Sequence, residues 1–556
     1  MAEAELEPEL SEAALIEHYA RLKADFEYFA PRCLVIRTKD AGNQPFILNE
    51  AQLFAHQTAE QQMADEGRVR IIVLKGRQQG MSTYIEGRFY WKVIHRKGVS
   101  AFILTHEGKA TGNLFEMATR YHDNCPDDLR PSTDRDSGKE LHFDLLDSGY
   151  KVGTAGSKGT GRSATFQYFH GSEVAFWPNA EDHTTGAMQT VPETSGEIWL
   201  ESTSDGMGNF FFFHWVKAVA GLNGYIALFI PWFWQSEYEM PYSGETLDSS
   251  GDEDNPDEQE LLDRFGPGGW DAPSEDPAKC LTPENLMWRR RKIAQLPDGV
   301  AQFKREYPND AQEAFENAGY KQLISARDVG RAISNGARVN ERGEHLNSAG
   351  GVIEARGPMI LGVDPARFGD DRLAIALRQG RVTWDITSYE HKMDQMEIAG
   401  LVKMILDSLP IDACFIDEGM GVGVIDSLHE QGYEQVEGVN FGAGAWNRDK
   451  YGNRRNEMWQ EMGEWFKDPN VVLIHSGAED REKKTEEATL DLCAVEYKFN
   501  SRNMKELEPK DKTKERLGLS PDCGDALALT FARPVAYSEP PPDGDPHSGR
   551  DETTGY

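Results

Sequence analysis

The sequence predicts an α/β protein with two domains, each built around a β-sheet. At 556 residues the chain is too long for a single hydrophobic core. In the first half, short apolar strands alternate with helical segments, which favours a mostly parallel sheet. A second series begins at Pro358, where three successive strands precede a helix, a strand, a helix and a strand. That order is typical of a ribonuclease-H-like core.

The N-terminal domain is expected to carry its functional groups at strand ends. Strands are predicted over residues 70–75, 101–105, 166–169, 197–203 and 225–230, and helices over residues 13–29 and 109–121. Ligands bind at the carboxyl ends of strands in parallel sheets. Residues 76–82, Glu173 and residues 202–204 all lie at such ends.

The first of these ends is a glycine-bounded loop. Residues 75–83 read Lys-Gly-Arg-Gln-Gln-Gly-Met-Ser-Thr, and a helix is expected to start near Ser82. Loop amides and a helix N-terminus that face an anion are the layout of a phosphate-binding P-loop. Met81 occupies the position where that motif has lysine. Read alone, the stretch is equally well explained as an ordinary strand-to-helix turn.

Other residues supply what ATP hydrolysis requires, which is a magnesium ligand and a positioned water besides the phosphate cradle. The Ser82 hydroxyl suits magnesium. Glu173 can orient the attacking water, although a surface glutamate after a strand would give the same pattern. Ser172 stands where such ATPases place a magnesium-binding aspartate. Gln52 precedes the loop, as an adenine-reading glutamine does in several ATPase classes; an exposed helical glutamine is the alternative.

Three aspartates of the C-terminal domain are predicted metal ligands. Strands are expected over residues 359–364, 373–377, 382–389, 413–417 and 436–440. Asp364 ends the first strand and Asp417 the fourth, which are neighbours in a ribonuclease-H-like sheet, and Asp525 lies one turn into the last helix. Two-metal cleavage of a phosphodiester needs carboxylates that converge on ions ~3.5–4 Å apart. Further candidates are Asp522, which the helix dipole also explains, and Asp371 and Glu418.

Charge and composition limit the possible partners. The formal net charge of −34 argues against general affinity for nucleic acid, so DNA would have to meet local basic surface. The candidates for phosphate contact are residues 289–292, Arg454, Arg455, Lys510, Lys512, Lys514 and Arg516. The six cysteines form no C-x-x-C pair, which argues against a disulfide framework or a zinc site. With an acidic N-terminus and no run of ~18 apolar residues, a soluble intracellular protein is expected.

The composition also divides the chain. The expected organisation is an N-terminal helical segment at residues 1–45, an ATPase domain at 46–330 with an acidic insertion at 237–283, a linker at 331–357, an endonuclease domain at 358–533 and a disordered tail at 534–556.

Six short motifs together resemble one protein family. They are residues 75–83, 170–177, 303–308, 313–315, 362–366 and 520–527. In this order the set is similar to the large terminase subunit of tailed bacteriophages, an ATPase and nuclease that packages DNA. The resemblance runs from about Leu48 to Leu529, nearly the whole chain.

The resemblance implies roles for individual residues. Arg77 matches an arginine early in the family's loop that acts on the phosphates, and Lys75 is a second cation nearby. Glu173 corresponds to the catalytic glutamate, and residues 202–204 resemble the motif that couples hydrolysis to movement. The implied nucleotide contacts are Gln52, Lys75, Gly76, Arg77, Gln78, Gln79, Gly80, Met81, Ser82 and Thr83. The implied cofactors are ATP and Mg²⁺, with Mn²⁺ possible at the nuclease site.

The function that follows is a viral DNA-packaging motor in the host cell cytoplasm. It would use ATP to translocate double-stranded DNA into the procapsid and cut concatemeric DNA with a two-metal endonuclease. The implied partners are viral DNA, the portal protein, a small terminase subunit and further copies of the chain in a ring, with no membrane. An ATP-dependent repair nuclease or helicase-nuclease is the alternative, but it would not predict the motifs at residues 303–315. A binding protein with degenerate sites is another, because of Met81 and Ser172.

Replacing Arg77 with alanine is expected to abolish ATP hydrolysis, because Arg77 supplies positive charge that Met81 cannot. The Met81→Ala variant should lose much less activity. Phosphate release by the two purified variants measures the contrast, and equal losses would contradict the role given to Arg77.

Overall fold

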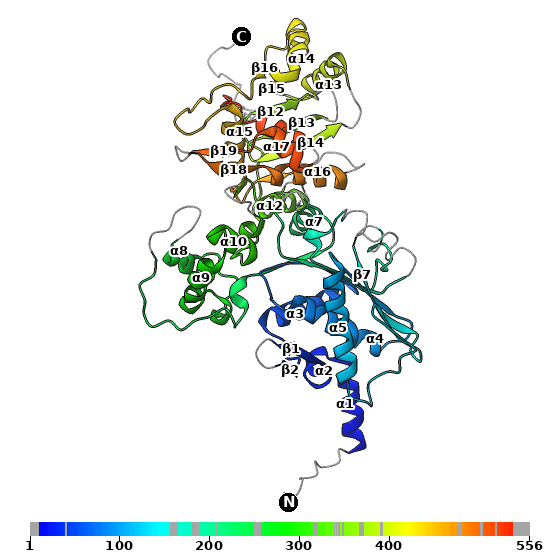
Figure 1. Cartoon of the computed structure of the whole chain (residues 1–556). Helices are drawn as coiled ribbons and strands as arrows, with labels where there is room; N and C mark the ends of the chain where they lie inside the picture. The colour runs from blue at the N-terminus through cyan, green and yellow to red at the C-terminus, as the bar shows by residue number, and fades with distance from the viewer. Residues whose placement is uncertain are drawn as a thin grey trace, which may run out of the picture. The chain divides into compact units, whose positions relative to one another are not determined.

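The computed structural model of the chain is shown in Figure 1. It describes residues 11–38, 42–155, 165–178, 180, 186, 188–206, 209–248, 257–315, 321–338, 340, 342, 345–346, 350–365, 372–389, 393–474, 481–500, 504–517 and 520–536. Two compact units are present, Met1–Gly319 and Tyr320–Tyr556. The predicted α/β class with two sheet domains is confirmed. Asp371, the centre of the acidic insertion and most of the predicted tail lie outside the described residues.

The first unit is organised around an eight-stranded sheet in the order β10-β3-β9-β8-β4-β7-β6-β5. Its strands are β3 (Val69–Lys75), β4 (Ser100–Thr105), β5 (Arg135–Ser137), β6 (Glu140–Phe143), β7 (Ser148–Thr154), β8 (Tyr168–Ser172), β9 (Glu197–Ser202) and β10 (Ile226–Ile230). All neighbours from β10 to β7 are parallel. The antiparallel edge of β5 to β7 was not predicted. Strand β9 therefore lies between the strand that enters the glycine-bounded loop and the strand that precedes Glu173.

The first unit also contains helices. They are α1 (Glu12–Ala24), α2 (Phe26–Cys33), α3 (Glu50–Glu66), α4 (Met81–Ile94), α5 (Gly108–Asn124), α7 (Phe210–Val219), α8 (Glu258–Phe265), α9 (Pro283–Gln295), α10 (Gly299–Glu306) and α11 (Ala311–Phe315). The helix expected over residues 13–29 is divided at Asp25, whose side chain caps α2. Phe26 and Phe29 of α2 join the core of the sheet domain. Strands β1 (Val35–Thr38) and β2 (Gly42–Pro45) form a small hairpin.

Buried charges fix helix α4 along strand β9. Arg88 donates to the Glu197 carboxylate at 2.8 Å, and Lys92 pairs with the same carboxylate. All three side chains are buried, and removing one partner of such a pair typically costs about 3–5 kcal/mol. The helix that follows the loop is therefore held in one position relative to β9.

Parts of the expected acidic insertion and of the basic run pack into the domain. Helix α8 buries Leu261 and Phe265 in the main core. Arg290 of α9 pairs with the buried carboxylate of Glu258, and Arg289 is only 5% exposed. Arg289 is therefore enclosed by the domain, and Glu258 balances the charge of Arg290.

The second unit contains a six-stranded sheet in the order β16-β15-β12-β13-β14-β17. The strands are β12 (Met359–Asp364), β13 (Leu373–Gln379), β14 (Val382–Tyr389), β15 (Ala413–Asp417), β16 (Val436–Val439) and β17 (Val472–Leu473). Strand β12 is antiparallel to β13 and parallel to β15, as a ribonuclease-H-like core requires. A second sheet joins β11 (Lys321–Gln322), β18 (Glu496–Phe499) and β19 (Lys505–Leu507).

Helices cover both faces of the six-stranded sheet. They are α12 (Ala326–Ala337), α13 (Gln395–Ser408), α14 (Glu418–Glu430), α15 (Arg454–Phe466), α16 (Arg481–Ala494), α17 (Lys510–Leu517) and α18 (Asp522–Leu529). Helices α13 and α14 pack against one face through Leu361 and Val363 of β12. Helix α12 belongs to this unit, because Asn335 donates to the carbonyls of Pro469 and Val471. In the described part of the chain, no helix combines the length and apolar character of a membrane span.

Helix α18 lies very close to the other face of β12 at Gly362. A Cβ atom added there would lie 2.0 Å from the carbonyl oxygen of Ala526. Only glycine permits this approach, which brings Asp525 of α18 beside Asp364 of β12. The glycine thus sets the geometry of the predicted nuclease site.

The Gly362→Ala variant should destabilise the second unit by about 1–3 kcal/mol, because the added methyl forces α18 away from β12. DNA cleavage should fall as well, since Asp525 moves with the helix. Gly400→Ala in α13 is the matched control: its added methyl meets no atom within 4 Å, and alanine favours helix. Thermal unfolding and nicking of plasmid DNA measure both effects, and equal behaviour of the two variants would contradict the role of Gly362.

Candidate active sites

The glycine-bounded loop is held in a defined conformation between β3 and α4. Gly80 has φ +74°, and a Cβ atom there would lie 2.6 Å from Nε2 of Gln52, so the position requires glycine. Gln78 also has a positive φ, 60°. The Arg77 amide donates to the Glu306 carbonyl at 2.9 Å, and the Gln79 side chain donates to the Trp232 carbonyl at 3.2 Å. The loop is therefore ordered by the surrounding chain.

Gln52 supports the loop from helix α3. Its Nε2 donates to the Gly80 carbonyl at 2.7 Å, and its Oε1 accepts from the Asn49 amide at 2.9 Å. The second bond is half of a capping box at the start of α3, in which Asn49 is the N-cap residue. Gln52 is 4% exposed. Its adenine-reading role stays a prediction.

Lys75, Ser82 and Glu173 come together at the strand ends. The Lys75 ammonium lies 3.3 Å from Glu173 Oε1 and 3.0 Å from Oε2 of Glu201. Burial alone would lower the pKa of Lys75, but the two glutamates raise it above its ordinary value. The lysine is therefore charged at neutral pH and neutralises carboxylates from two strands.

Glu173 has the strained backbone that is common in functional sites. Its φ is 54°, in the left-handed region that glycine favours, and among the described residues only Gln78, Asp147 and Glu173 share this feature outside glycine. Its carboxylate accepts from the Thr203 amide at 3.3 Å and the Thr203 hydroxyl at 3.4 Å. Glu173 thus contacts the predicted coupling segment, residues 202–204, and its side chain remains 29% exposed.

Two buried residues of this site were not predicted, Glu201 and His170. The Glu201 carboxylate accepts from the Ser82 hydroxyl at 2.7 Å and the Ser172 hydroxyl at 2.8 Å. The His170 ring lies between Glu201, at 3.4 Å, and Glu86, at 2.7 Å. Burial would lower the pKa of His170, but these two glutamates raise it to about 9. The available sequence signal was a glutamate near the end of an otherwise apolar strand.

Arg77 and Met81 lie outside this cluster. The Arg77 side chain is 58% exposed and pairs with Glu306 at 3.4 Å. Met81 is 1% exposed in the hydrophobic core, so its alanine variant would also lose about 2–5 kcal/mol of stability. Met81→Leu, which nearly conserves volume, is therefore the better control for Arg77→Ala. The role of Arg77 stays a prediction.

The aspartates of the second unit converge as the topology predicts. Val363 of β12 pairs with Ile416 of β15, so Asp364 and Asp417 follow at the same edge of the sheet. The Lys510 ammonium lies 2.8 Å from Asp525 Oδ2 and 3.4 Å from Asp364 Oδ2. Asp525 also accepts from the indole of Trp459 at 2.7 Å. Lys510, which is expected to contact DNA phosphates, lies where the carboxylates meet.

The carboxylates respond in opposite ways to their surroundings. Burial, together with the charges of Asp525, Asp522 and Asp417, raises the pKa of Asp364 despite Lys510. Burial would also raise the pKa of Asp525, but Lys510 and Arg455 hold it below its ordinary value. Carboxylates this close cannot all ionise without a cation, so a bound cation would strongly stabilise the ionised form of the cluster.

Several of the remaining candidates have structural partners. Asp522 accepts from the Arg372 amide at 3.0 Å and lies 3.8 Å from Lys510. Arg455 donates to the Glu508 carbonyl at 3.0 Å, and Arg454 pairs with Glu457 at 2.9 Å. The Glu418 side chain packs over Gly438 of β16. The side chain of Arg516 lies outside the described residues.

Both clusters contain hard oxygen donors, which Mg²⁺ and Mn²⁺ prefer. Among the described residues, no three His, Cys, Asp or Glu side chains are already arranged around a metal position. The Lys510 ammonium nevertheless lies within 3.8 Å of carboxylates from Asp364, Asp522 and Asp525. A cation at this point fits the chemistry of the donors. Asp364, Asp417 and Asp525 are the residues that would hold metal ions.

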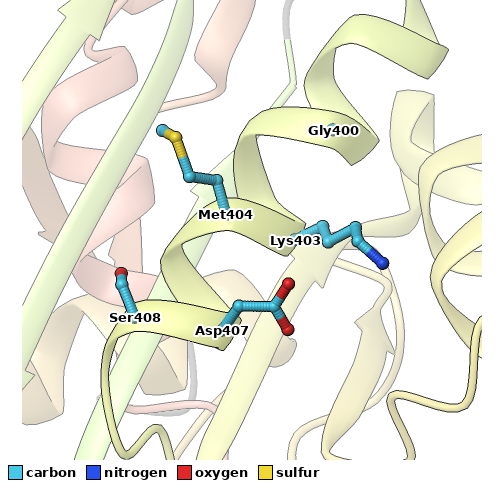
Figure 2. Close-up of a pocket in the computed structure, with 5 residues that line it drawn as sticks. All are labelled: Gly400, Lys403, Met404, Asp407 and Ser408. Atoms are coloured by element: carbon cyan, nitrogen blue, oxygen red, sulfur yellow. The ribbon is translucent and has the colours of Figure 1, made fainter.

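A separate pocket on helix α13 does not belong to either cluster. Figure 2 shows its lining residues, Gly400, Lys403, Met404, Asp407 and Ser408. Lys403 lies 5.3 Å over the Tyr433 ring, and Asp407 accepts from the Tyr433 hydroxyl. Its charged groups are thus engaged with the protein, and all of its lining comes from one helix.

Comparison with known proteins places the chain near one class of protein. No family model and no curated protein matches it. The large terminase of bacteriophage HK97 is 12% identical over 92% of this chain and 99% of that chain, with a TM-score of 0.42. The nuclease domain of the large terminase subunit gp2 of bacterial virus Sf6 is 18% identical over 38% of this chain and 99% of that chain, with a TM-score of 0.32.

A third solved structure is the ATPase domain of the large terminase of Thermus phage P74-26. It is 16% identical over 47% of this chain and 92% of that chain, with a TM-score of 0.31. Large terminases are thus the class that these matches name. At these identities and TM-scores, the roles of residues in this chain rest on its own geometry.

Exchanging one carboxylate in each cluster should separate two activities. Asp364→Asn is expected to abolish DNA cleavage and leave ATP turnover unchanged, because it changes a predicted metal ligand of the second unit only. Glu173→Gln should reduce ATP turnover by about 10²–10⁴-fold and spare cleavage. Phosphate release and plasmid nicking measure the two activities, and circular dichroism checks folding. Loss of both activities in a folded single variant would count against two separate sites.

Proposed function

We propose that this chain is a viral DNA-packaging motor that combines an ATPase with a metal-dependent DNA endonuclease. The observation that carries the proposal is the presence of both clusters in one chain. A phosphate-type loop meets a lysine and two glutamates in the first unit, and aspartates converge on a lysine in the second unit. Each cluster lies at the carboxyl ends of its strands, where α/β sheets bind ligands.

The ATPase reaction divides among residues of the first unit. Amides of Gln79 and Gly80 and the start of α4 bind the phosphates. Lys75 contributes positive charge, and the partly exposed carboxylate of Glu173 orients the attacking water. Mg²⁺, when bound, neutralises charge on the phosphates, and the Ser82 hydroxyl is one of its ligands. Arg77 remains the candidate for charge that the missing loop lysine would supply, and Gln52 the candidate for adenine recognition.

The nuclease reaction uses Asp364, Asp417 and Asp525. Metal ions held by these carboxylates supply Lewis acidity and an activated water, and Mg²⁺ or Mn²⁺ suits the oxygen donors. Lys510 can contact the scissile phosphate or the carboxylates, since its ammonium already lies among them. Contacts of this kind position DNA without reading its sequence.

The packaging role rests on the resemblance of the motifs at residues 303–308 and 313–315. One contact in the first unit favours their link to ATP chemistry: the Arg77 amide donates to the carbonyl of Glu306, in the first of these motifs. We propose double-stranded viral DNA as the substrate. The portal protein, a small terminase subunit and further copies of the chain in a ring are the proposed partners, in the host cell cytoplasm.

Purified protein with double-stranded DNA and portal should hydrolyse ATP, and with Mg²⁺ or Mn²⁺ it should cut plasmid DNA. Phosphate release and gel electrophoresis measure these activities, with EDTA as the control that removes both. Absence of both activities would overturn the enzymatic proposal. ATP-driven strand separation that is independent of portal would favour the repair helicase-nuclease instead.

A further inference from the structure

Glu201 contacts several residues of the first cluster, although the sequence did not predict it as a site residue. It lies on β9, and its partner in the register on β8 is Ser172. The side chain is fully buried. One carboxylate oxygen accepts from the Ser82 and Ser172 hydroxyls, at 2.7 and 2.8 Å, and the other lies 3.0 Å from the Lys75 ammonium. The carboxylate thus joins β9 to the start of α4 and to the end of β8.

These contacts place a carboxylate where the ATP site would otherwise lack one for magnesium. In P-loop ATPases, magnesium is held by the hydroxyl at the start of the loop helix and by an aspartate on a neighbouring strand. The hydroxyl is present here as Ser82, but Ser172 at the aspartate position has no carboxylate. A glutamate on β9 reaches the same place, because its register brings it level with Ser172 and its longer side chain bonds both hydroxyls.

We infer that Glu201 supplies the carboxylate that Ser172 lacks and, with Ser82, holds the Mg²⁺ of the bound nucleotide. This inference rests on the ATPase function proposed above. Glu173 is free for a different task, because its carboxylate is partly exposed and contacts Thr203. The two glutamates therefore have separate roles, one buried beside the helix start and one facing the solvent.

His170 is the positioning residue for this ligand. Its ring is fully buried and lies 3.4 Å from Oε1 of Glu201 and 2.7 Å from Oε1 of Glu86 on α4. The ring thus contacts one Glu201 oxygen, and Lys75 contacts the other. Metal-binding carboxylates commonly have polar neighbours that orient their oxygens.

A structural role is the competing explanation, in which Glu201 serves only as a counter-ion for Lys75. The explanations differ in what Mg²⁺ does to nucleotide affinity. Isothermal titration of the full chain with the non-hydrolysable analogue AMP-PNP, with Mg²⁺ and with EDTA, measures this coupling. Because the readout is nucleotide affinity, metal binding in the nuclease domain does not enter it.

In the wild type, Mg²⁺ should increase the affinity for AMP-PNP. In Glu201→Gln, affinity in EDTA should stay within about threefold of the wild type, and the gain from Mg²⁺ should fall at least tenfold. Adding Ser172→Asp to Glu201→Gln should restore the gain, because it returns a carboxylate to the conventional strand. Glu140→Gln on β6 removes the same charge elsewhere in the domain and should leave the gain intact.

Three results would overturn the inference. A full Mg²⁺-dependent gain in Glu201→Gln would mean that another group holds the metal. Loss of AMP-PNP binding in EDTA as well, without rescue by Ser172→Asp, would identify Glu201 as a counter-ion for Lys75. Failure of the wild type to bind AMP-PNP under any condition would overturn the ATPase function itself and the ligand assignment with it.

Discussion

In both units of this protein, buried carboxylates are stabilised by a nearby cation, and this pairing determines how the surrounding strands and helices are arranged. Burying a carboxylate without a partner is costly, and placing several together multiplies the cost. In the first unit Lys75 meets Glu173 and Glu201, and in the second Lys510 meets Asp364 and Asp525. The same cost explains why the clusters suit divalent metals. In each case carboxylates from separate elements are brought to the ends of parallel strands, and a lysine from nearby balances them.

The features that the sequence predicted correctly depend on local patterns. Apolar runs identified β3, β8, β12 and β15, and their polar ends located Lys75, Glu173, Asp364 and Asp417. The convergence of Asp364 and Asp417 followed from the strand order of one known core. Glu201, His170 and the position of Lys510 could not be predicted in this way. Their roles depend on the register between β8 and β9 and on a lysine from α17, relations between segments that no local pattern encodes.

Runs of basic residues were the least reliable indication of a surface that could contact DNA. Arg289 and Arg290 stand out in an acidic sequence, yet one is buried and the other pairs with buried Glu258. Arg455 is likewise turned toward the Glu508 carbonyl and Asp525. A basic residue in a chain with a net charge of −34 has many acidic partners available, so its charge is readily neutralised within the fold. Surface for DNA has to be identified from side-chain contacts and cannot be read from composition.

Strand β9 carries a glutamate near each end of the face that meets α4. Glu197 pairs with Arg88 and Lys92, and Glu201 pairs with Lys75 and Ser82. A slip of one residue in the register would turn both glutamates to the opposite face, away from Arg88, Lys92 and Lys75, and these buried cations would lose part of their charge compensation. Hydrophobic pattern alone would not prevent such a slip, because every residue of β9 is buried. The two glutamates therefore fix the register of β9 relative to α4. An insertion or deletion within this strand should be far less tolerated than a conservative substitution, because it would shift one glutamate relative to the other.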